Sequence, residues 1–389
     1  MLSIQPIEHV KALCSDVGPR GPTTEAEARA AAYAAARLGD FGARDVSVEP
    51  FRSVPSLWWA FEVASGIALA STAIYLYSRG SAWGWSALLC ALAICAIVAE
   101  LSFWKVSLSN LLPKRVSQNV YGKISPKGKT ARRLVVIGHL DTNRTPLLFH
   151  PSLVPYLNLI LMAVAGCVAL KGLIFLFAGV QDGAGVRGAV LILDIPAAVA
   201  LLVMLHGDLF SPFTQGANDN ATGAAVTLSV AELFSRDPLE RTEYWALCTG
   251  CEEATLTGIR AFLDKHGEEL KDAYFVDLEC LGIGKLRYIT YEGMLKKCYS
   301  NSGLLRAASE AAKALGDGSV EASPLKLGYT ETAVVISHGL RGITVMAFPE
   351  GSELVPHWHQ TSDRLENIDP RNLDKAVRFL VALAREIDS

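Results

Sequence analysis

Four stretches of the chain are predominantly apolar, and each is long enough to form a membrane-spanning helix. They cover residues 57–77, 83–104, 153–180 and 186–205. An α-helix needs roughly 20 apolar residues to cross a bilayer. Tryptophans lie near the ends of the first two stretches, as is typical of side chains at a membrane interface. Short connections at 78–82 and 181–185 join the stretches in pairs, so the pattern predicts two transmembrane helical hairpins.

Shorter apolar patterns outside the hairpins predict the strands and helices of an α/β domain. The β-branched run LVVIG at 134–138 is typical of a buried strand, and so is EYWALCTG at 243–250. AAVTLSVAELF at 224–234 has the 3.6-residue period of an amphipathic helix. We therefore expect one discontinuous domain, interrupted by the hairpins 57–104 and 153–205. Its segments are 1–56, 105–152 and 206–389.

Two residues of opposite charge fall inside the second predicted hairpin, where an isolated charge is costly. Lys171 and Asp194 lie at matching distances from the middle of the connection between its two helices. In an antiparallel hairpin they are therefore at the same depth. We expect them to form an ion pair.

Candidate metal ligands lie where the predicted strands and helices begin or end. His139 directly follows the strand at 134–138. Asp141 lies two residues further on the same face, where a carboxylate can orient a metal-bound imidazole. Asp219, in the turn GANDNATG, precedes the helix at 224–234. Taken singly, a surface histidine and a helix N-cap are the ordinary interpretations of such residues.

Glu252 and Glu253 are adjacent acids that follow the strand at 243–250. Neighbouring carboxylates repel each other and need partners, while their side chains point in different directions. This suits two roles, in which one carboxylate binds a metal and the other accepts a proton from water. A solvated acidic loop is the alternative interpretation. Because zinc sites use imidazole nitrogens and carboxylate oxygens, these residues together indicate a zinc-dependent hydrolase.

The order of these motifs resembles that of the di-zinc aminopeptidase family, which includes bacterial leucyl aminopeptidases, glutamate carboxypeptidase, the transferrin receptor and glutaminyl cyclase. The family pattern is His-x-Asp, Asp-Asn in a glycine-rich turn, Glu-Glu, an acid before a glycine, and a histidine ahead of Thr and Asp. The corresponding motifs here are VVIGHLDT, GANDNATG, CTGCEEATLTG, VDLECLG and PHWHQTSD. The Gly-Pro-Arg sequence at 18–20 and residues 328–331 extend the resemblance.

The resemblance implies a three-layer α/β zinc-peptidase fold with a mixed central sheet, into which the four transmembrane helices are inserted. It also implies two zinc ions per chain, with Asp219 between them. One zinc would be bound in addition by His139 and Glu279. The other would be bound by Glu253 and His359.

By the same resemblance, Glu252 would be the general base and Asp141 would orient the first histidine ligand. The implied reaction is hydrolysis of the N-terminal residue of a peptide by a water that the two metals activate. The chain is thus similar to a zinc aminopeptidase with added membrane hairpins.

Three positions leave alternatives open. The family usually has Asp where Glu279 stands, and Asp277 lies two residues earlier on the same strand face; the spacing to the following glycine favours Glu279. His357 competes with His359, and the spacing to the following Thr and Asp favours His359. Tyr329 is a candidate donor to the tetrahedral oxyanion, although a packed aromatic is the simpler interpretation.

Composition supports a membrane protein and gives no sign of nucleic-acid binding. The chain of 389 residues is 51% hydrophobic and 19% charged, with a mean hydropathy of +0.28, which is unusual for a soluble hydrolase. Its formal net charge is −3 and it has no basic cluster. We therefore expect a peptide substrate and a lipid bilayer as partners. The sequence does not indicate an oligomeric state.

Charges beside the hairpins indicate the orientation of the domain. Arg52, Lys105, Lys114 and Arg115 flank the hairpins on the domain side, whereas the far connections carry only Arg79 and Arg187. The positive-inside rule then places the catalytic domain in the cytoplasm. The polar opening MLSIQPIEHVKALCSD, which lacks the pattern of a cleavable signal, agrees with this.

Two other functions use the same sequence features. A glutaminyl-cyclase-like acyltransferase would keep the fold and the metals but form a ring instead of hydrolysing. A non-catalytic membrane scaffold would use the hairpins and keep only a vestigial site.

Overall fold

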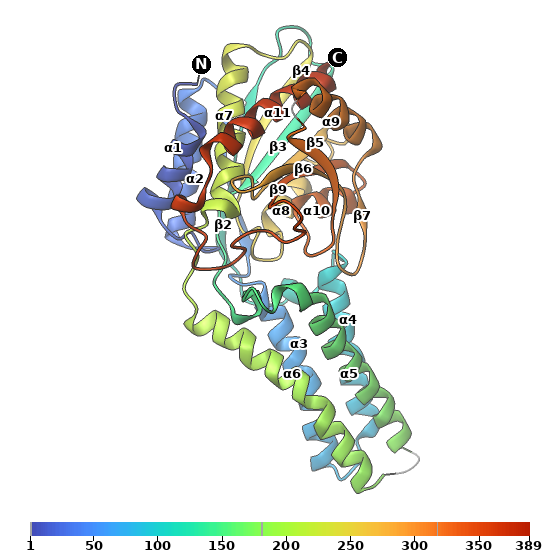
Figure 1. The fold of residues 1–389 in the computed structure, drawn as a ribbon. Helices are drawn as coiled ribbons and strands as arrows, with labels where there is room; N and C mark the ends of the chain where they lie inside the picture. Colours follow the sequence, from blue (N-terminus) through green and yellow to red (C-terminus); the bar gives the residue numbers. More distant parts are fainter. Residues whose placement is uncertain (1, 180–181, 317) are drawn as a thin grey trace. The chain divides into compact units, whose positions relative to one another are not determined.

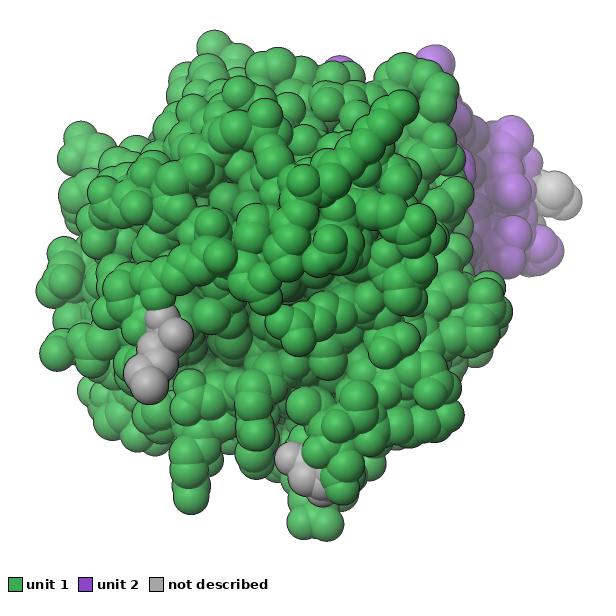
Figure 2. Space-filling model, turned by 90° about the horizontal axis from the view of Figure 1, so that it is seen from above, with its two compact units in different colours: residues 1–55, 114–145, 212–389 green, residues 56–113, 146–211 purple. Residues whose placement is uncertain are grey.

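The computed structural model describes residues 2–179, 182–316 and 318–389. These residues form two compact units, drawn in different colours in Figure 2. Unit 1 is the larger one and consists of three segments, Met1–Pro55, Lys114–Thr145 and Pro212–Ser389. Unit 2 consists of Ser56–Pro113 and Pro146–Ser211.

Unit 1 is an α/β domain built around one mixed sheet (Figure 1). Its strands are β1 (Arg44–Ser53), β2 (Arg115–Ile124), β3 (Arg132–His139), β4 (Thr242–Thr249), β5 (Tyr274–Glu279), β6 (Lys285–Glu292), β7 (Cys298–Tyr299), β8 (Val320–Leu325) and β9 (Arg341–Phe348). Its α-helices are α1 (Pro6–Lys11), α2 (Glu25–Asp40), α7 (Thr222–Arg236), α8 (Thr257–His266), α9 (Ser302–Leu315), α10 (Glu331–Ser337) and α11 (Pro370–Asp388). The strand order is β1-β2-β4-β3-β5-β9-β6-β7, and β8 pairs with β6.

The four central strands, β4, β3, β5 and β9, are parallel to one another, whereas β2 and β6 flank them in the antiparallel direction. Parallel strands end at the same edge of a sheet. His139 pairs with Thr249 at the ends of β3 and β4, and Glu279 ends β5. The candidate residues are therefore brought to one edge although they are far apart in the sequence.

Helices cover both faces of the sheet, so the unit has three layers. On one face, α2, α7, α9 and α11 pack over the strands and share one large hydrophobic core with them. On the other face lie α8 and α10. The central strands are buried along nearly their whole length, which explains why β3 and β4 are apolar runs without alternation. The predicted three-layer fold with a mixed sheet is confirmed.

Two glycines let the start of α7 approach the sheet closely. A Cβ atom on Gly138, the last residue before His139, would lie 2.6 Å from the backbone of Gly223. A Cβ atom on Gly223 would lie 2.2 Å from the carbonyl oxygen of Leu278. Any side chain at either position would push α7 away from the sheet. The turn that carries Asp219 can therefore reach the ends of β3 and β5 only because these residues are glycines.

Unit 2 contains the four apolar helices predicted from the sequence, together with short 3-10 turns. The helices are α3 (Trp58–Tyr77), α4 (Trp83–Leu101), α5 (Leu157–Ala178) and α6 (Ala184–Phe210). All four are long and apolar enough to cross a membrane, counting the short turn that precedes α5 as part of its span. They expose large apolar side chains such as Leu159, Ile192 and Leu202. A helix that is apolar on its outer face as well as its inner face is typical of a membrane span.

The observed helix ends differ in detail from the predicted stretches. The second helix stops at Leu101, three residues short of the predicted end, and α6 runs from Ala184 to Phe210, beyond both predicted ends. Helix bounds depend on backbone hydrogen bonds, which continue into polar residues that a hydrophobicity pattern leaves out. The predicted end of the third stretch at Val180, and Gln181 in the connection, lie outside the described residues.

Lys171 and Asp194 form the predicted ion pair inside unit 2. Lys171 is 0% exposed, and its ammonium group also donates a hydrogen bond to the carbonyl oxygen of Ala68 on α3. One lysine thus joins three helices, because Asp194 is on α6 and Lys171 on α5. A charge that is buried in this way is tolerated because it has both an ionic partner and a hydrogen-bond acceptor.

We predict that Lys171 and Asp194 depend on each other for stability. Either Lys171→Met or Asp194→Asn should lower the free energy of unfolding by about 3 kcal/mol, because each leaves a buried polar group without its partner. The double variant should recover a large part of this loss, which a double-mutant cycle in detergent will measure. Strictly additive losses would contradict the coupling.

Candidate metal centre

Asp219 lies between two histidines and directs one carboxylate oxygen at each of them. Its Oδ1 is 3.2 Å from Nε2 of His139, and its Oδ2 is 3.3 Å from Nε2 of His359. The aspartate belongs to the short turn Ala217–Ala221 before α7, and it is not the N-cap of that helix. Histidines that are 220 residues apart in the sequence are thus joined through one carboxylate.

A second acid accompanies each histidine. Glu279 at the end of β5 places Oε2 3.5 Å from Nε2 of His139. Glu253 places Oε2 3.1 Å from Nε2 of His359. His139, Asp219 and Glu279 thus form one group of possible ligands, and Asp219, Glu253 and His359 form another. Nearly all of these side chains' surface is buried.

These residues fit two zinc ions. Around a tetrahedral zinc with bonds of about 2.0–2.1 Å, neighbouring ligand atoms are about 3.3 Å apart. The observed separations between ligand atoms are 3.1 to 3.5 Å. Among the described residues, Oε1 of Glu253 and Oε1 of Glu279 are buried without a hydrogen-bond partner. Buried carboxylate oxygens need a proton, a donor or a cation, and two imidazoles with three carboxylates are a typical zinc donor set.

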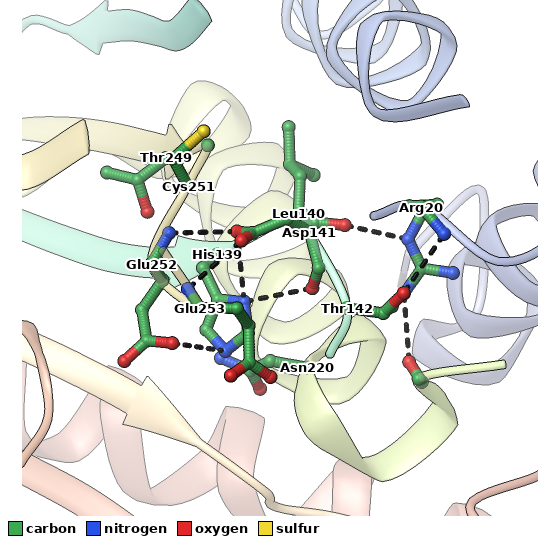
Figure 3. Close-up of polar contacts among 12 residues, drawn as sticks. Arg20, His139, Leu140, Asp141, Thr142, Asn220, Thr249, Cys251, Glu252 and Glu253 are labelled. Atoms are coloured by element: carbon green, nitrogen blue, oxygen red, sulfur yellow. Dashed lines mark hydrogen bonds and ion pairs between the residues drawn. The ribbon is translucent and has the colours of Figure 1, made fainter. Parts of the chain in front are cut away.

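Asp141 holds both the histidine and the Glu252–Glu253 pair. Nδ1 of His139 lies 3.1 Å from the carbonyl oxygen of Asp141 and 3.5 Å from its Oδ1, so a proton on Nδ1 points away from the metal position. The carboxylate of Asp141 accepts hydrogen bonds from the backbone amides of Glu252 at 3.1 Å and Glu253 at 3.0 Å. Figure 3 shows this contact between the two loops.

The side chain of Glu252 points into the same space as the ligands. Its Oε2 lies 3.8 Å from Nε2 of His139, farther than the oxygens of Asp219 and Glu279. His139, Glu252 and Glu253 form a third group of possible ligands, so this carboxylate lies near the metal positions although it is the farthest of the three acids from His139. The geometry matches that of a base beside a metal.

Three residues next to the site have a left-handed backbone. Cys251 before Glu252, Cys280 after Glu279, and His359 itself all have φ near +51°. This conformation costs a non-glycine residue of the order of 1–3 kcal/mol, and it persists only where the surroundings impose it. Such residues cluster at functional sites. Here they lie at or beside Glu252, Glu279 and His359, whose side chains converge.

The turn that carries Asp219 is held by residues that sequence reasoning did not assign. Asp363 accepts hydrogen bonds from the backbone amides of Asn218 and Asp219 at 2.7 and 3.2 Å. Asn220 donates to the carbonyl oxygen of Leu278 on β5 at 2.7 Å. The motif PHWHQTSD contains Asp363, and only its position in that motif could have suggested a role.

Two charged residues near the N-terminus, Arg20 and Glu27, form hydrogen bonds with the backbone of the site loops. Arg20 is fully buried and donates hydrogen bonds to five carbonyl oxygens, including those of Leu140 and Gly216 (Figure 3). Glu27 accepts hydrogen bonds from the backbone amides of Thr23 and Cys251, and from the hydroxyl of Ser117. Thr24 caps α2 by accepting from the backbone amide of Glu27, while Glu27 accepts from the amide of Thr23, one residue before the cap. A threonine followed three residues later by a glutamate predicts a helix start and gives no hint of the contact with Cys251.

The structure places the alternative residues outside the two ligand groups. Asp277 accepts a hydrogen bond from the backbone amide of Thr332 at 3.2 Å, so the geometry favours Glu279. Nδ1 of His357 lies 2.8 Å from the hydroxyl of Ser362. The hydroxyl of Tyr329 accepts hydrogen bonds from two backbone amides of the loop at 295–296 and donates to the carbonyl oxygen of Lys296. Its role at an oxyanion stays a prediction that these bonds do not support.

Glu279, Glu252 and His139 hold their protons more tightly than exposed side chains of the same kinds do. Burial raises the pKa of Glu279 to about 8 and raises the pKa of Glu252 well above its usual value. Burial alone would lower the pKa of His139, but the carboxylates of Glu279 and Glu252 raise it well above its usual value. Each raised pKa means that the group retains a proton, which a bound divalent cation would displace.

Comparisons with known proteins show the family and the fold of the chain. The model of peptidase family M28 matches residues 119–384. A zinc aminopeptidase from Bacillus subtilis is similar over 98% of this chain and 94% of its own, with 16% identity and a TM-score of 0.60. An aminopeptidase from Aneurinibacillus sp. strain AM-1 is similar over 97% of this chain and 92% of its own, with 14% identity and a TM-score of 0.58. A glutaminyl cyclase from Tannerella forsythia is similar over 98% of this chain and 97% of its own, with 14% identity and a TM-score of 0.57. A search of curated proteins gives no match.

The chain therefore belongs to peptidase family M28. The family match covers more than half of the chain and confirms the resemblance that the motifs predicted. The solved structures share the fold at low identity.

We predict that Glu27 makes stability depend on pH. Burial, followed by the charge of Asp141, raises the pKa of Glu27 to about 8, against 4.5 for an unperturbed glutamate. Between these values the folded protein keeps a proton that the unfolded chain has lost, so the free energy of unfolding falls as pH rises. Relative to Glu27→Gln, the wild type should lose up to about 1.4 kcal/mol per pH unit in this window, measured by chemical denaturation.

A control variant on the same helix separates this effect from a general one. Glu25→Gln, on the exposed side of α2, should leave the pH dependence of the wild type unchanged. Parallel curves for the wild type and Glu27→Gln would contradict the account.

Proposed function

We propose that this protein is a membrane-anchored aminopeptidase that uses two zinc ions. The observation that carries the proposal is the position of Asp219, whose two carboxylate oxygens face two different histidines, each with its own second acid. One zinc position is formed by His139, Asp219 and Glu279. The other is formed by Asp219, Glu253 and His359.

The residues around these positions divide the work of hydrolysis. Two bound zinc ions would supply Lewis acidity and lower the pKa of water to about 7. Glu252 accepts the proton of the attacking water and delivers it to the leaving amine. Burial is the main cause that raises the pKa of Glu252 above its usual value, so its carboxylate holds a proton more tightly than an exposed glutamate does. Asp141 keeps Glu252 in place by accepting a hydrogen bond from its backbone amide.

Preference for peptide N-termini is supported by the similar solved structures, two of which are named as aminopeptidases. The second candidate, glutaminyl-cyclase-like ring formation, is supported by the Tannerella forsythia structure, which is matched over 97% of its length. The two reactions differ in product. Release of an N-terminal amino acid supports the peptidase, and loss of ammonia from an N-terminal glutamine supports the cyclase.

The four apolar helices of unit 2 would anchor the protein in the bilayer. The chain leaves unit 1 after Pro55 and again after Thr145, and each time it returns after two helices long enough to cross a membrane. Two crossings bring a chain back to the side where it started, so all three segments of unit 1 would be on one side. We further propose that this is the cytoplasmic side, on the charges that flank the hairpins.

Glu252→Gln should lower kcat for release of N-terminal residues by about 10² to 10⁴ while zinc content stays unchanged. The amide keeps the shape of the carboxylate but cannot accept the proton. His359→Ala is the contrasting variant and should lower zinc content as well. A panel of free and amino-blocked peptides, with metal analysis of each protein, gives both readouts. Turnover of blocked peptides at the same rate as free ones would contradict the aminopeptidase assignment.

The proposed topology predicts the location of each connection. A fluorescent protein fused after Ser389 should fluoresce in the cytoplasm. Alkaline phosphatase inserted in the 78–82 connection should be active, because that connection would be on the opposite side. The reverse pattern would place the catalytic unit outside the cytoplasm.

A further inference from the structure

Asn143 belongs to none of the motifs that define the site, yet its side chain lies inside the site. It follows Thr142 in the loop after β3, and it is 7% exposed. Its Oδ1 accepts a hydrogen bond from the backbone amide of Arg144 at 2.7 Å. Its Nδ2 donates to Oε2 of Glu253 at 2.8 Å. The first bond determines which end of the amide faces Glu253.

The same nitrogen lies against the ring of His359, at 3.3 Å from Nδ1 and 3.4 Å from Nε2. Asn143 therefore touches both residues that, with Asp219, form one of the two candidate metal positions. Among the described residues, the structure gives it no hydrogen bond to His139 or Glu279, which form the other position. Its hydrogen bonds to possible metal ligands thus go to Glu253 and His359.

We propose that Asn143 is a positioning residue that holds Glu253 for one zinc ion and leaves the other zinc unaffected. This inference rests on the proposed two-zinc function. A neutral amide can orient a carboxylate without cancelling its charge, whereas a lysine or arginine in this place would compete with a cation. Asn143 donates to Oε2, the same oxygen of Glu253 that faces His359, and this bond fixes the orientation of the carboxylate. The other oxygen, Oε1, is buried without a hydrogen-bond partner.

The test is the release of zinc from detergent-purified full-length protein into a chelator, measured for each of the two ions. Hydrogen-bond partners of metal ligands typically contribute 10–100-fold to metal affinity. Asn143→Ala should therefore weaken one zinc by about 10- to 100-fold and leave the other at the wild-type affinity. Asn143→Leu has a similar volume without the donor and should give the same split, so a folding defect of one variant does not decide the result.

Glu253→Gln identifies the zinc that is affected, because it changes a ligand of that position directly. In the double variant, Asn143→Ala should add little to the loss caused by Glu253→Gln, since both act through one carboxylate. Asn301→Ala is a control, because it removes a side-chain amide that caps α9 and should change neither zinc. Equal weakening of both ions, or of neither, would overturn the role of Asn143. A wild type that binds fewer than two zinc ions would instead overturn the two-zinc function itself.

Discussion

Asp219 can serve two histidines only if the end of β3, the turn before α7 and the loop after β9 come within reach of one short side chain. The oxygens of Asp219 lie 3.2 and 3.3 Å from the two imidazoles, which leaves little tolerance in any of the three segments. Close packing at Gly138 and Gly223 brings the turn to the sheet, and Asp363 joins it to the loop that carries His359. Much of unit 1 can be understood as the support for this convergence.

The second constraint is electrostatic. Four carboxylates gather in a buried space with two histidines, and their mutual repulsion opposes folding in the absence of cations. Their supports are mainly neutral: the amide of Asn143 binds Glu253, and the neighbouring carboxylates Asp141 and Asp363 position the site loops through backbone amides. The one fully buried guanidinium here, Arg20, bonds to carbonyl oxygens. Neutral donors orient the carboxylates and preserve the charge that two divalent cations would need.

The sequence carried the sheet, the hairpins and the convergent acids because these depend on local patterns and on motif order. Apolar runs end where His139 and Glu252 begin, and parallel strands must bring such ends together. The Lys171–Asp194 pair was predictable because residues at equal distances from the connection of an antiparallel hairpin lie at the same depth. The contacts of Asn143 and Glu27 were not, because they join segments far apart in the chain and leave no period or spacing. Asp363 lies in the motif PHWHQTSD, but its hydrogen bonds to the turn of Asp219 were equally beyond the sequence pattern. Glu27 shows the difficulty well, since its place three residues after the N-cap Thr24 already accounts for a glutamate there without the contact to Cys251.

The number of zinc ions bound per chain tests the account most directly. Protein purified in detergent is stripped with a chelator and titrated with zinc while bound metal is counted. The account predicts saturation at two equivalents, falling to about one when His359 is replaced by alanine, because Asp219 can still serve His139 and Glu279. Saturation at one equivalent in the wild type, or the absence of tight binding, would contradict the claim that Asp219 lies between two metals.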